Sequence, residues 1–322
     1  MKRIGRAILG AFVWYAISAA SAADTRYPSR PVRLIAPFAP GGPSDTLARL
    51  LSARLNDTLG QPVIVDNRPA AAGIVGFELV AKASPDGYTV LLGSAGGLTM
   101  NPSLYAKLPY DPQRDYQAIT QIESGPQIAV VHPSVAAKSI PELIALAKGK
   151  PGQINFASAG TSNRLAAELF KVQAGIDIVN VPYKGTSQAL VDLVGGQVHM
   201  MMASALSAIS LLKAGKLRGL AVTSIRRAQV LPDLPTVAES GLPGYESTSW
   251  HGVLVPAHTP KTVVTLLHRE IVAVLQQPDV KERLGSQGFD VVASAPEQFA
   301  AYIKEQRNKY DKLIRQIGLK AE

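Results

Sequence analysis

Residues 32–51, VRLIAPFAPGGPSDTLARLL, decide the fold that we expect, because an apolar strand leads through a glycine-rich loop directly into a helix. The Gly41-Gly42 pair permits a tight turn with positive φ, and Ser44 or Asp45 is a typical N-cap before the periodic leucines. Such a loop predicts an anion site, because glycines and the unpaired N–H groups of a helix N-terminus let an anion approach the main chain. A simple turn, with Asp45 only as its cap, would fit the same residues.

The N-terminus has the pattern of a secretory signal peptide over residues 1–22. Basic residues precede a largely apolar run at 7–19, and Ala20-Ser21-Ala22 fits the small-residue rule for cleavage. We expect cleavage after Ala22 or Ala23. The formal charge of +9 then falls to +6, because three cationic side chains and no acidic ones are removed.

Composition favours an exported globular protein with two domains. The chain has 322 residues, of which 47% are hydrophobic, enough for two cores at about 150 residues each. It has no cysteine, which excludes a disulfide scaffold and thiol chemistry. Lysine and arginine are spread along the chain without a basic run, so we expect no nucleic-acid partner.

Short apolar strands alternate with amphipathic helices along the chain, which predicts the α/β class with helices on both faces of the sheets. The expected strands are residues 32–38, 63–65, 89–92, 129–131, 154–156, 179–181, 198–202, 219–222 and 252–255. The expected helices are residues 44–59, 75–83, 140–147, 162–174, 186–194, 205–214, 260–275 and 296–317.

Three further loops are rich in glycine and hydroxyl residues, as expected where a ligand binds at the edge of a sheet. Residues 93–97 (GSAGG), 157–162 (ASAGTS) and 183–186 (YKGT) each follow an expected strand. Ligands of open α/β sheets bind beyond the carboxyl ends of strands, so these loops strengthen the prediction of an anion pocket. No Gly/Ser-rich linker separates two halves of the chain. Strands that cross between two domains would explain why such a linker is missing.

Seven motifs in order along the chain carry a family resemblance. They are YPSRPVRLIAPFAPGG from Tyr27, LGQPVIVDNRPAAAG from Leu59, SPDGYTVLLG from Ser84, NPSLYAKLPYDPQRDY from Asn101, VPYKGTSQALVDLVGGQV from Val181, LRGLAVTS from Leu217 and LPDLPTVAESGLPGYE from Leu231. Over essentially the whole mature chain, the sequence closely resembles the solute receptors of tripartite tricarboxylate transporters, also called the Bug family.

The resemblance implies a periplasmic binding protein of the two-lobed, type II-like α/β fold, with an interlobe cleft that closes on a carboxylated solute. It implies no catalysis, no cofactor and a membrane permease as partner. We expect lobe 1 to comprise residues 24–124 and 251–322, and lobe 2 to comprise residues 125–250, in a monomer.

In such receptors, the loops that match residues 38–45 and 158–164 hold one ligand carboxylate through main-chain N–H groups, small hydroxyl groups and bridging water. The predicted ligand-binding residues are Phe38, Ala39, Pro40, Gly41, Gly42, Ser44, Asp45, Ser94, Ala95, Gly96, Ser158, Ala159, Gly160, Thr161, Ser162, Arg164, Ala203 and Ser204. Each hydrogen bond to a charged group contributes about 1.5–3 kcal/mol. Several of them therefore reach the about −8 kcal/mol of micromolar affinity without an ion pair.

Two departures from the family pattern bear on the ligand. Many members have a loop like SAGNGSxxHL, whereas SAGTSNRL here is two residues shorter and places Arg164 where histidine is common. Arg164 is either a bidentate clamp for a second ligand carboxylate or an exposed arginine on the first helical turn, and we favour the exposed arginine. Residues 201–204 (MMAS) replace a common Asp-Asn pair, which removes a partner for an amino group. We expect a dicarboxylate or an aromatic carboxylate.

Several side chains keep two interpretations. The methionines at 200–202 either line an adaptable apolar pocket or belong to the core. Trp250 is either hinge packing, which we favour, or a wall of the cleft. Lys184 either faces the cleft or makes a surface or interlobe contact.

Other kinds of site have no support in the sequence. The five histidines lack metal-ligand spacing, so we expect no metal. The glycine-rich loops match no nucleotide motif, and Ser94 has no identifiable histidine and acid partners. Besides transport, the chain could serve as a receptor that docks onto a membrane sensor kinase or, less favoured, as a secreted hydrolase of small carboxylated esters.

Overall fold

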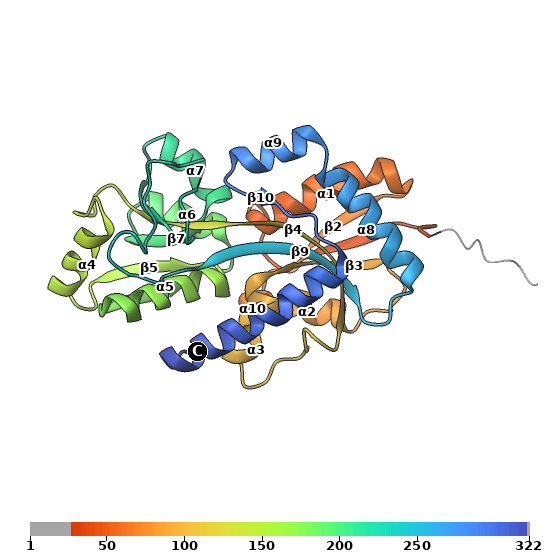
Figure 1. Cartoon of the computed structure of the whole chain (residues 1–322), viewed down its shortest axis with the longest axis horizontal. Helices are drawn as coiled ribbons and strands as arrows, with labels where there is room; N and C mark the ends of the chain where they lie inside the picture. Colours follow the sequence, from red (N-terminus) through yellow and green to blue (C-terminus); the bar gives the residue numbers. More distant parts are fainter. Residues whose placement is uncertain (1–26, 229, 321–322) are drawn as a thin grey trace, which may run out of the picture.

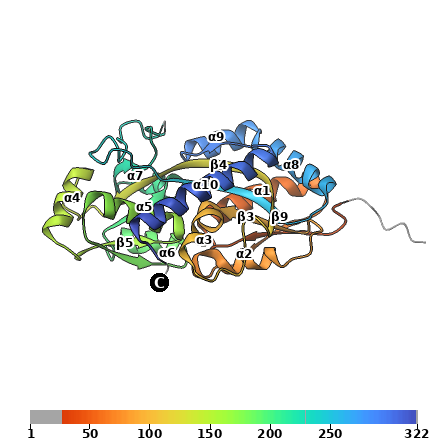
Figure 2. The same cartoon turned by 60° about the horizontal axis from the view of Figure 1, so that its bottom comes forward.

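The computed structural model describes residues 27–228 and 230–320, so the predicted signal peptide lies outside the described residues. The molecule is elongated, and its two halves lie side by side along the long axis (Figure 1). Helices lie on both sides of the strands in each half, which confirms the predicted α/β class (Figures 1 and 2).

The first half contains the parallel strands predicted from the opening stretch. Strand β1 pairs with β2 on one side and with β3 on the other. Its elements are β1 (Val32–Ala36), α1 (Pro43–Leu59), β2 (Val63–Asn67), the short η1 (Ala71–Gly73), α2 (Ile74–Ala81), β3 (Thr89–Ser94), the π-helical turn η2 (Gly96–Met100) and α3 (Asn101–Leu104).

The second half repeats this arrangement with β5 between two parallel neighbours, β6 and β7. Its elements are α4 (Ile140–Gly149), β5 (Ile154–Ser158), α5 (Thr161–Ala174), β6 (Ile178–Pro182), α6 (Thr186–Val194), β7 (Met200–Ser204), α7 (Ala205–Lys213) and β8 (Arg218–Val222).

Two antiparallel strands run between the halves: β4 (Tyr116–Val131) and β9 (Thr248–Pro256). Strand β4 pairs with β9 as far as Pro126, and from Gln127 onward it pairs with β7 and β8. The strand order is β2-β1-β3-β9-β4-β7-β5-β6, with β8 and β10 (Asp290–Val291) also paired to β4. Crossing strands thus take the place of a linker. The expected lobe boundaries fall within them, where Gly125 lies opposite Ser249, and they remain a prediction.

The C-terminal segment supports the crossing strands. It contains α8 (Lys261–Leu275), α9 (Pro278–Ser286) and α10 (Pro296–Ile317), and α10 lies along the strands toward the second half (Figures 1 and 2). Trp250 of β9 is fully buried, and its ring makes edge contacts with Phe299 and Tyr302 of α10, at centroid distances of 5.6 and 5.5 Å. Trp250 therefore packs at the crossing strands and does not line a cleft.

Two features differ from the sequence-based expectation. Strand β4 begins at Tyr116 rather than near residue 129, because buried Thr120, Gln121 and Glu123 interrupt its apolar pattern. The short elements η1, η2, α3 and α9 are additional to the expected helices, since each contains glycine, proline or few periodic apolar residues.

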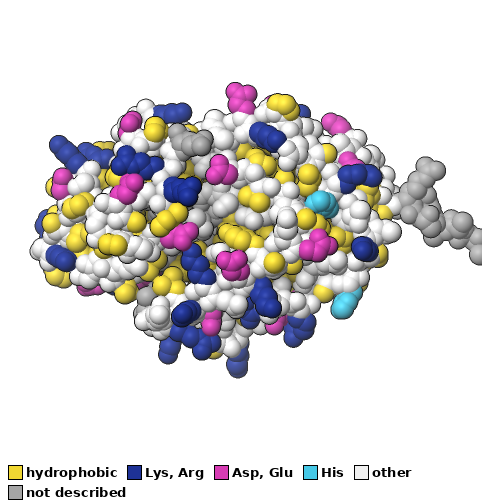
Figure 3. All heavy atoms as spheres, viewed as in Figure 1, with side chains coloured by type: hydrophobic (Ala, Val, Ile, Leu, Met, Phe, Trp, Pro, Cys, Tyr) yellow, Lys and Arg dark blue, Asp and Glu magenta, His cyan; other side chains and the backbone are white. Residues whose placement is uncertain are grey.

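The face in Figure 3 carries lysine and arginine side chains interspersed with aspartate and glutamate. Within residues 27–228 and 230–320, no helix combines the length and the apolarity needed to cross a membrane.

Substitution of Phe299→Ala is expected to lower the free energy of unfolding by about 3–5 kcal/mol. Phe299 is fully buried, and its removal leaves a cavity beside Trp250. Urea denaturation followed by circular dichroism measures the change. Val191→Ala, at a side chain that is 69% exposed, is the control and should shift stability by less than about 0.5 kcal/mol. Equal shifts in the two variants would contradict the assigned packing.

Candidate ligand-binding site

Helix N-termini from both halves meet at one place between them. α1, α5, α6 and α7 each follow a strand, and their N-caps are Gly42, Gly160, Gly185 and Ser204. None of these four N-termini has a side-chain cap hydrogen bond. The first N–H groups of a helix need an acceptor and carry the positive end of its dipole, so this convergence favours an anion.

The N-termini surround a cavity of about 50 Å³, the small cavity, which has room for a few water molecules or one carboxylate group. It is lined by Phe38, Ala39, Gly42, Pro43, Ser44, Ser94, Gly96, Ala159, Gly160, Thr161, Ser162, Asn163, Thr186, Ser204, Ser249 and His251. No lysine, arginine, aspartate or glutamate is among these described lining residues. Charge can enter its wall only through His251.

A second cavity of about 370 Å³, the large cavity, adjoins the small one. The two share Phe38 and residues 159–161 of the second-half loop. The remaining wall of the large cavity is formed by Ala70, Ala72, Leu104, Tyr105, Ser158, Arg164, Asn180, Pro182, Tyr183 and Lys184. The small cavity is thus polar and sized for an anionic group, whereas the large one has two further aromatic rings and two cations.

Most of the predicted ligand-binding residues come together at these cavities. Those that line the small cavity are Phe38, Ala39, Gly42, Ser44, Ser94, Gly96, Ala159, Gly160, Thr161, Ser162 and Ser204. Ser158 and Arg164 line only the large cavity. The side chains or backbone of Pro40, Gly41, Asp45, Ala95 and Ala203 line neither. Of these, Pro40 and Gly41 lie against Ser187 of α6 instead.

The helix α1 begins differently from the expectation. Its N-cap is Gly42, because Pro43 occupies the first helical position and puts Ser44 and Asp45 inside the first turn. The Asp45 carboxylate turns away from the small cavity and accepts hydrogen bonds of 2.9 Å from the Gly41 N–H and from Arg49. Burial alone would raise the pKa of Asp45, but these hydrogen bonds outweigh it and hold the pKa below its ordinary value.

Burial also distinguishes between the two interpretations of Arg164, of the methionines and of Lys184. The Arg164 side chain is only 18% exposed and lies 4.0 Å from Glu168, so the favoured interpretation as an exposed arginine is wrong. The methionines of β7 at 200–202 are fully buried in the core and line neither cavity. Lys184 is exposed and contributes to the rim of the large cavity.

His251 and Glu123 are not among the residues predicted from the sequence, yet both lie at the site. His251 Nε2 lies 3.1 Å from Ser44 Oγ, and His251 Nδ1 lies 2.6 Å from Glu123 Oε1. All three side chains are buried. Nearby, Ser94 Oγ is buried in the wall of the small cavity and has no hydrogen-bond partner within the described part of the chain. No local motif marks His251 or Glu123, because they meet only when β4 pairs with β9.

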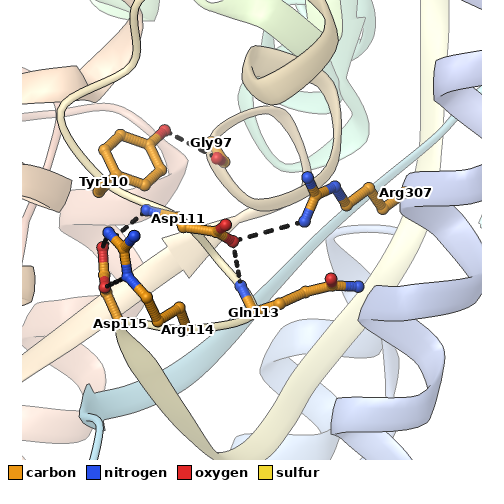
Figure 4. A network of polar contacts seen from close by, with 7 residues as sticks. All are labelled: Gly97, Tyr110, Asp111, Gln113, Arg114, Asp115 and Arg307. Atoms are coloured by element: carbon orange, nitrogen blue, oxygen red, sulfur yellow. Dashed lines mark hydrogen bonds and ion pairs between the residues drawn. The ribbon is translucent and has the colours of Figure 1, made fainter.

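A polar network anchors the turn η2, to which Gly96 belongs (Figure 4). The hydroxyl group of Tyr110 donates to the carbonyl of Gly97 at 2.8 Å, and Arg307 of α10 reaches Asp111 at 3.5 Å. On the other side, Thr161 at the start of α5 donates to Asn101 at 2.6 Å. The turn η2 is therefore held between the first half, α10 and the second half.

Two α/β halves joined by crossing strands, with a small anion-attracting cavity between them, define the class of two-lobed solute-binding proteins. The chain belongs to the tripartite tricarboxylate transporter family of receptors: the model of the tripartite tricarboxylate transporter family receptor matches residues 47–319. This confirms the resemblance seen in the motifs.

Similar proteins match this chain in sequence and in structure over nearly its whole length. BugT of Bordetella pertussis is 36% identical over 98% of this chain and 97% of its own. The structure of an R. palustris protein with adipate has a TM-score of 0.89 and 34% identity, and covers 91% of this chain and 99% of its own. MatC from Rhodopseudomonas palustris with bound malate has a TM-score of 0.86 and 32% identity, and covers 89% of this chain and all of its own. The family that matches this chain is a family of receptors, so the fold carries a binding role.

Substitution of Asp45→Asn is expected to destabilise the protein by about 1–3 kcal/mol at pH 7, because hydrogen bonds to an ionised acceptor are lost. The pKa of Asp45 is lowered in the fold, so the difference from wild type should be complete above the unfolded value of about 4 and shrink as the pH falls through the folded value. Urea titrations at pH 7 and below pH 4 test this. Asp57→Asn, at an exposed position of the same helix, is the control. A gap that is unchanged at low pH would contradict the pairing.

Proposed function

We propose that this receptor captures a small carboxylated solute, with a dicarboxylate or an aromatic carboxylate favoured, and delivers it to a permease of the tripartite tricarboxylate type. The observation that carries the proposal is the convergence of four N-termini without side-chain caps on a cavity whose described lining has no acidic side chain. The buried hydroxyl of Ser94, unpartnered among the described residues, adds a donor. A carboxylate would satisfy these donors, whereas a cation would meet the positive ends of four helices.

The large cavity favours a ligand with a second acidic or aromatic end. Its aromatic side chains Tyr105 and Tyr183 can pack against a ligand body, and its cations Arg164 and Lys184 can attract a second carboxylate. Adipate and malate, found with two structural neighbours, are both dicarboxylates. No acidic side chain lines either cavity among the described residues, which disfavours a ligand amino group.

Binding would favour the closed arrangement of the two halves. The small cavity takes Ser44, Ser94 and Gly96 from the first half and residues 159–163 from the second. A ligand that contacts both sides gains interactions that an opened form lacks, and it shifts the population toward closure. The same contacts would present a closed surface to the permease.

A ligand screen tests the proposed function. Thermal shift and isothermal titration calorimetry of the purified protein would compare adipate, malate, citrate, acetate, benzoate, phthalate and the common amino acids. A ligand that binds the folded state raises the melting temperature. Shifts with dicarboxylates or aromatic acids support the proposal. Shifts with amino acids alone would refute the ligand class, and silence across the screen would refute the carboxylate site.

Transport is tested separately from binding. Cells that lack this chain should lose uptake of the carboxylate that the purified protein binds. Binding without any effect on uptake would overturn the permease partnership and favour docking onto a sensor kinase.

Substitution of Gly96→Ala should weaken binding of the best carboxylate at least tenfold, about 1.4 kcal/mol. A Cβ atom on Gly96 would lie 2.9 Å from Thr161 Cβ and 3.2 Å from the Ser162 nitrogen, so the two halves could not approach fully. Calorimetry measures the loss. Gly149→Ala is the matched control, because a Cβ atom there meets nothing within 4 Å. Unchanged affinity in Gly96→Ala would place the ligand elsewhere.

Substitution of Arg164→Ala should separate dicarboxylates from monocarboxylates. If Arg164 holds the second carboxylate, affinity for a dicarboxylate falls about 10- to 100-fold, as expected for a charge-assisted hydrogen bond. Affinity for a monocarboxylate should change little. Lys148→Ala, on α4, serves as the charge control. Equal losses for both ligand classes would show that Arg164 acts on the fold of the loop.

A further inference from the structure

Three buried side chains, Ser44, His251 and Glu123, contact one another in a row, and the packing of the fold gives no reason for them. Ser44 lies at the start of α1, His251 on β9 and Glu123 on β4, and their exposed fractions are 3%, 5% and 0%. The contacts are 3.1 Å between Ser44 Oγ and His251 Nε2, and 2.6 Å between His251 Nδ1 and Glu123 Oε1. A buried carboxylate costs several kcal/mol unless it is paired, so the pair calls for a reason.

The surroundings leave the pair with few charged neighbours. Glu123 Oε2 has no hydrogen-bond partner among the described residues, and burial raises the pKa of Glu123 against the opposing effect of His251. On α1, the charged side chains nearest Ser44 in the chain are Asp45 and Arg49, which pair with each other. On β10, Asp290 is exposed and lies opposite Ser124, next to the Glu123 position.

The remaining elements around His251 face it with uncharged groups. Ser94 lies opposite it on β3, and α5 and α7 present residues 161–163 and Ser204 to the same cavity. His251 is therefore the one ionisable side chain in the described wall of the small cavity.

The hydroxyl group of Ser44 can point in two directions. If His251 Nε2 carries no proton, it accepts from the Ser44 O–H, and the lone pairs of Ser44 then face the cavity. If His251 Nε2 carries a proton, it donates to Ser44 Oγ, and the Ser44 O–H is free to donate into the cavity. Only the second arrangement suits a carboxylate ligand.

We propose that Glu123 and His251 are positioning residues that together hold two protons, one in the Nδ1–Oε1 contact and one on Nε2, and thereby set Ser44 as a hydrogen-bond donor to the ligand carboxylate. This inference rests on the proposed function. With both protons the pair is neutral, whereas loss of the Nε2 proton leaves a buried negative charge beside a negative ligand. Carboxylate binding and retention of the proton therefore favour each other, as linkage requires.

The same order of serine, histidine and carboxylate occurs in serine hydrolases, where the histidine takes the proton of the serine. Here the direction is reversed: the imidazole gives a hydrogen bond to the serine, and the serine gives one to the ligand. The ligand is then bound by hydrogen bonds and no covalent bond forms, in keeping with a family of receptors.

The test measures affinity and proton uptake together. Calorimetry with adipate and with malate, from pH 5.5 to pH 9 in two buffers of different ionisation enthalpy, gives the dissociation constant and the number of protons bound. Affinity should be constant at low pH and fall about tenfold for each pH unit above the titration of the pair, with up to one proton taken up on binding. Adipate and malate should show the same profile, since both present a carboxylate.

Variants separate positioning from structure. Glu123→Gln should move the fall in affinity about one to three pH units lower, because the negative partner that retains the proton is gone. Ser44→Ala should lose about 10- to 100-fold in affinity at pH 7, the worth of a hydrogen bond to a charged group. His132→Gln, at a histidine of the second half that lines neither cavity, should leave the profile unchanged.

The outcomes distinguish this inference from the proposed function. If a carboxylate binds with the same affinity from pH 5.5 to pH 9, without proton uptake and with Glu123→Gln unaltered, the inference is overturned and the receptor function stands. If neither acid binds, the proposed function is in question. The ring ¹⁵N shifts of His251 in the ligand-free protein then decide the inference, which fails if Nε2 carries no proton at pH 6.

Discussion

Backbone pairing between β4 and β9 carries the chain from one half to the other, and both the sheet and the site depend on it. Adjacent residues of a strand point to opposite faces, so Trp250 packs against α10 while His251 reaches the small cavity. The same pairing brings Glu123 opposite His251. One register thus fixes both the packing of Trp250 and the chemistry of the cavity wall, and a slip by one residue would exchange the faces to which Trp250 and His251 point.

The glycine-rich loops could be predicted because their information is local. In the segments around Gly42, Gly160 and Gly185, a strand, a small-residue turn and a helix start follow one another within a few residues. The sequence of such a segment therefore indicates where a helix begins, and hence which backbone N–H groups lack an acceptor. The N-cap residue of α1 is harder to predict from the sequence. Pro43 takes the first helical position, so the N-cap is Gly42 and not Ser44 or Asp45.

The polar residues of the crossing strands could not be predicted in this way. Glu123 and His251 are 128 residues apart, and neither belongs to a motif. A glutamate within YQAITQIESGPQIAVV is typical of an exposed position, and it is buried here because β4 lies within the sheet and is covered by helices from distant parts of the chain. The burial of Arg164 could not be predicted for a related reason. Its surroundings include residues from distant parts of the chain, such as Lys320.

The absence of a flexible linker between the halves has a thermodynamic consequence for capture. A loose tether would sample many relative orientations of the two halves, and a ligand would have to offset the entropy lost when one of them is selected. Strands β4 and β9 are paired along the crossing, where Gly125 lies opposite Ser249, so they allow the halves fewer relative orientations than a loose tether would. Less of the contact energy is then needed to offset lost entropy, and more of it remains for holding a bound solute.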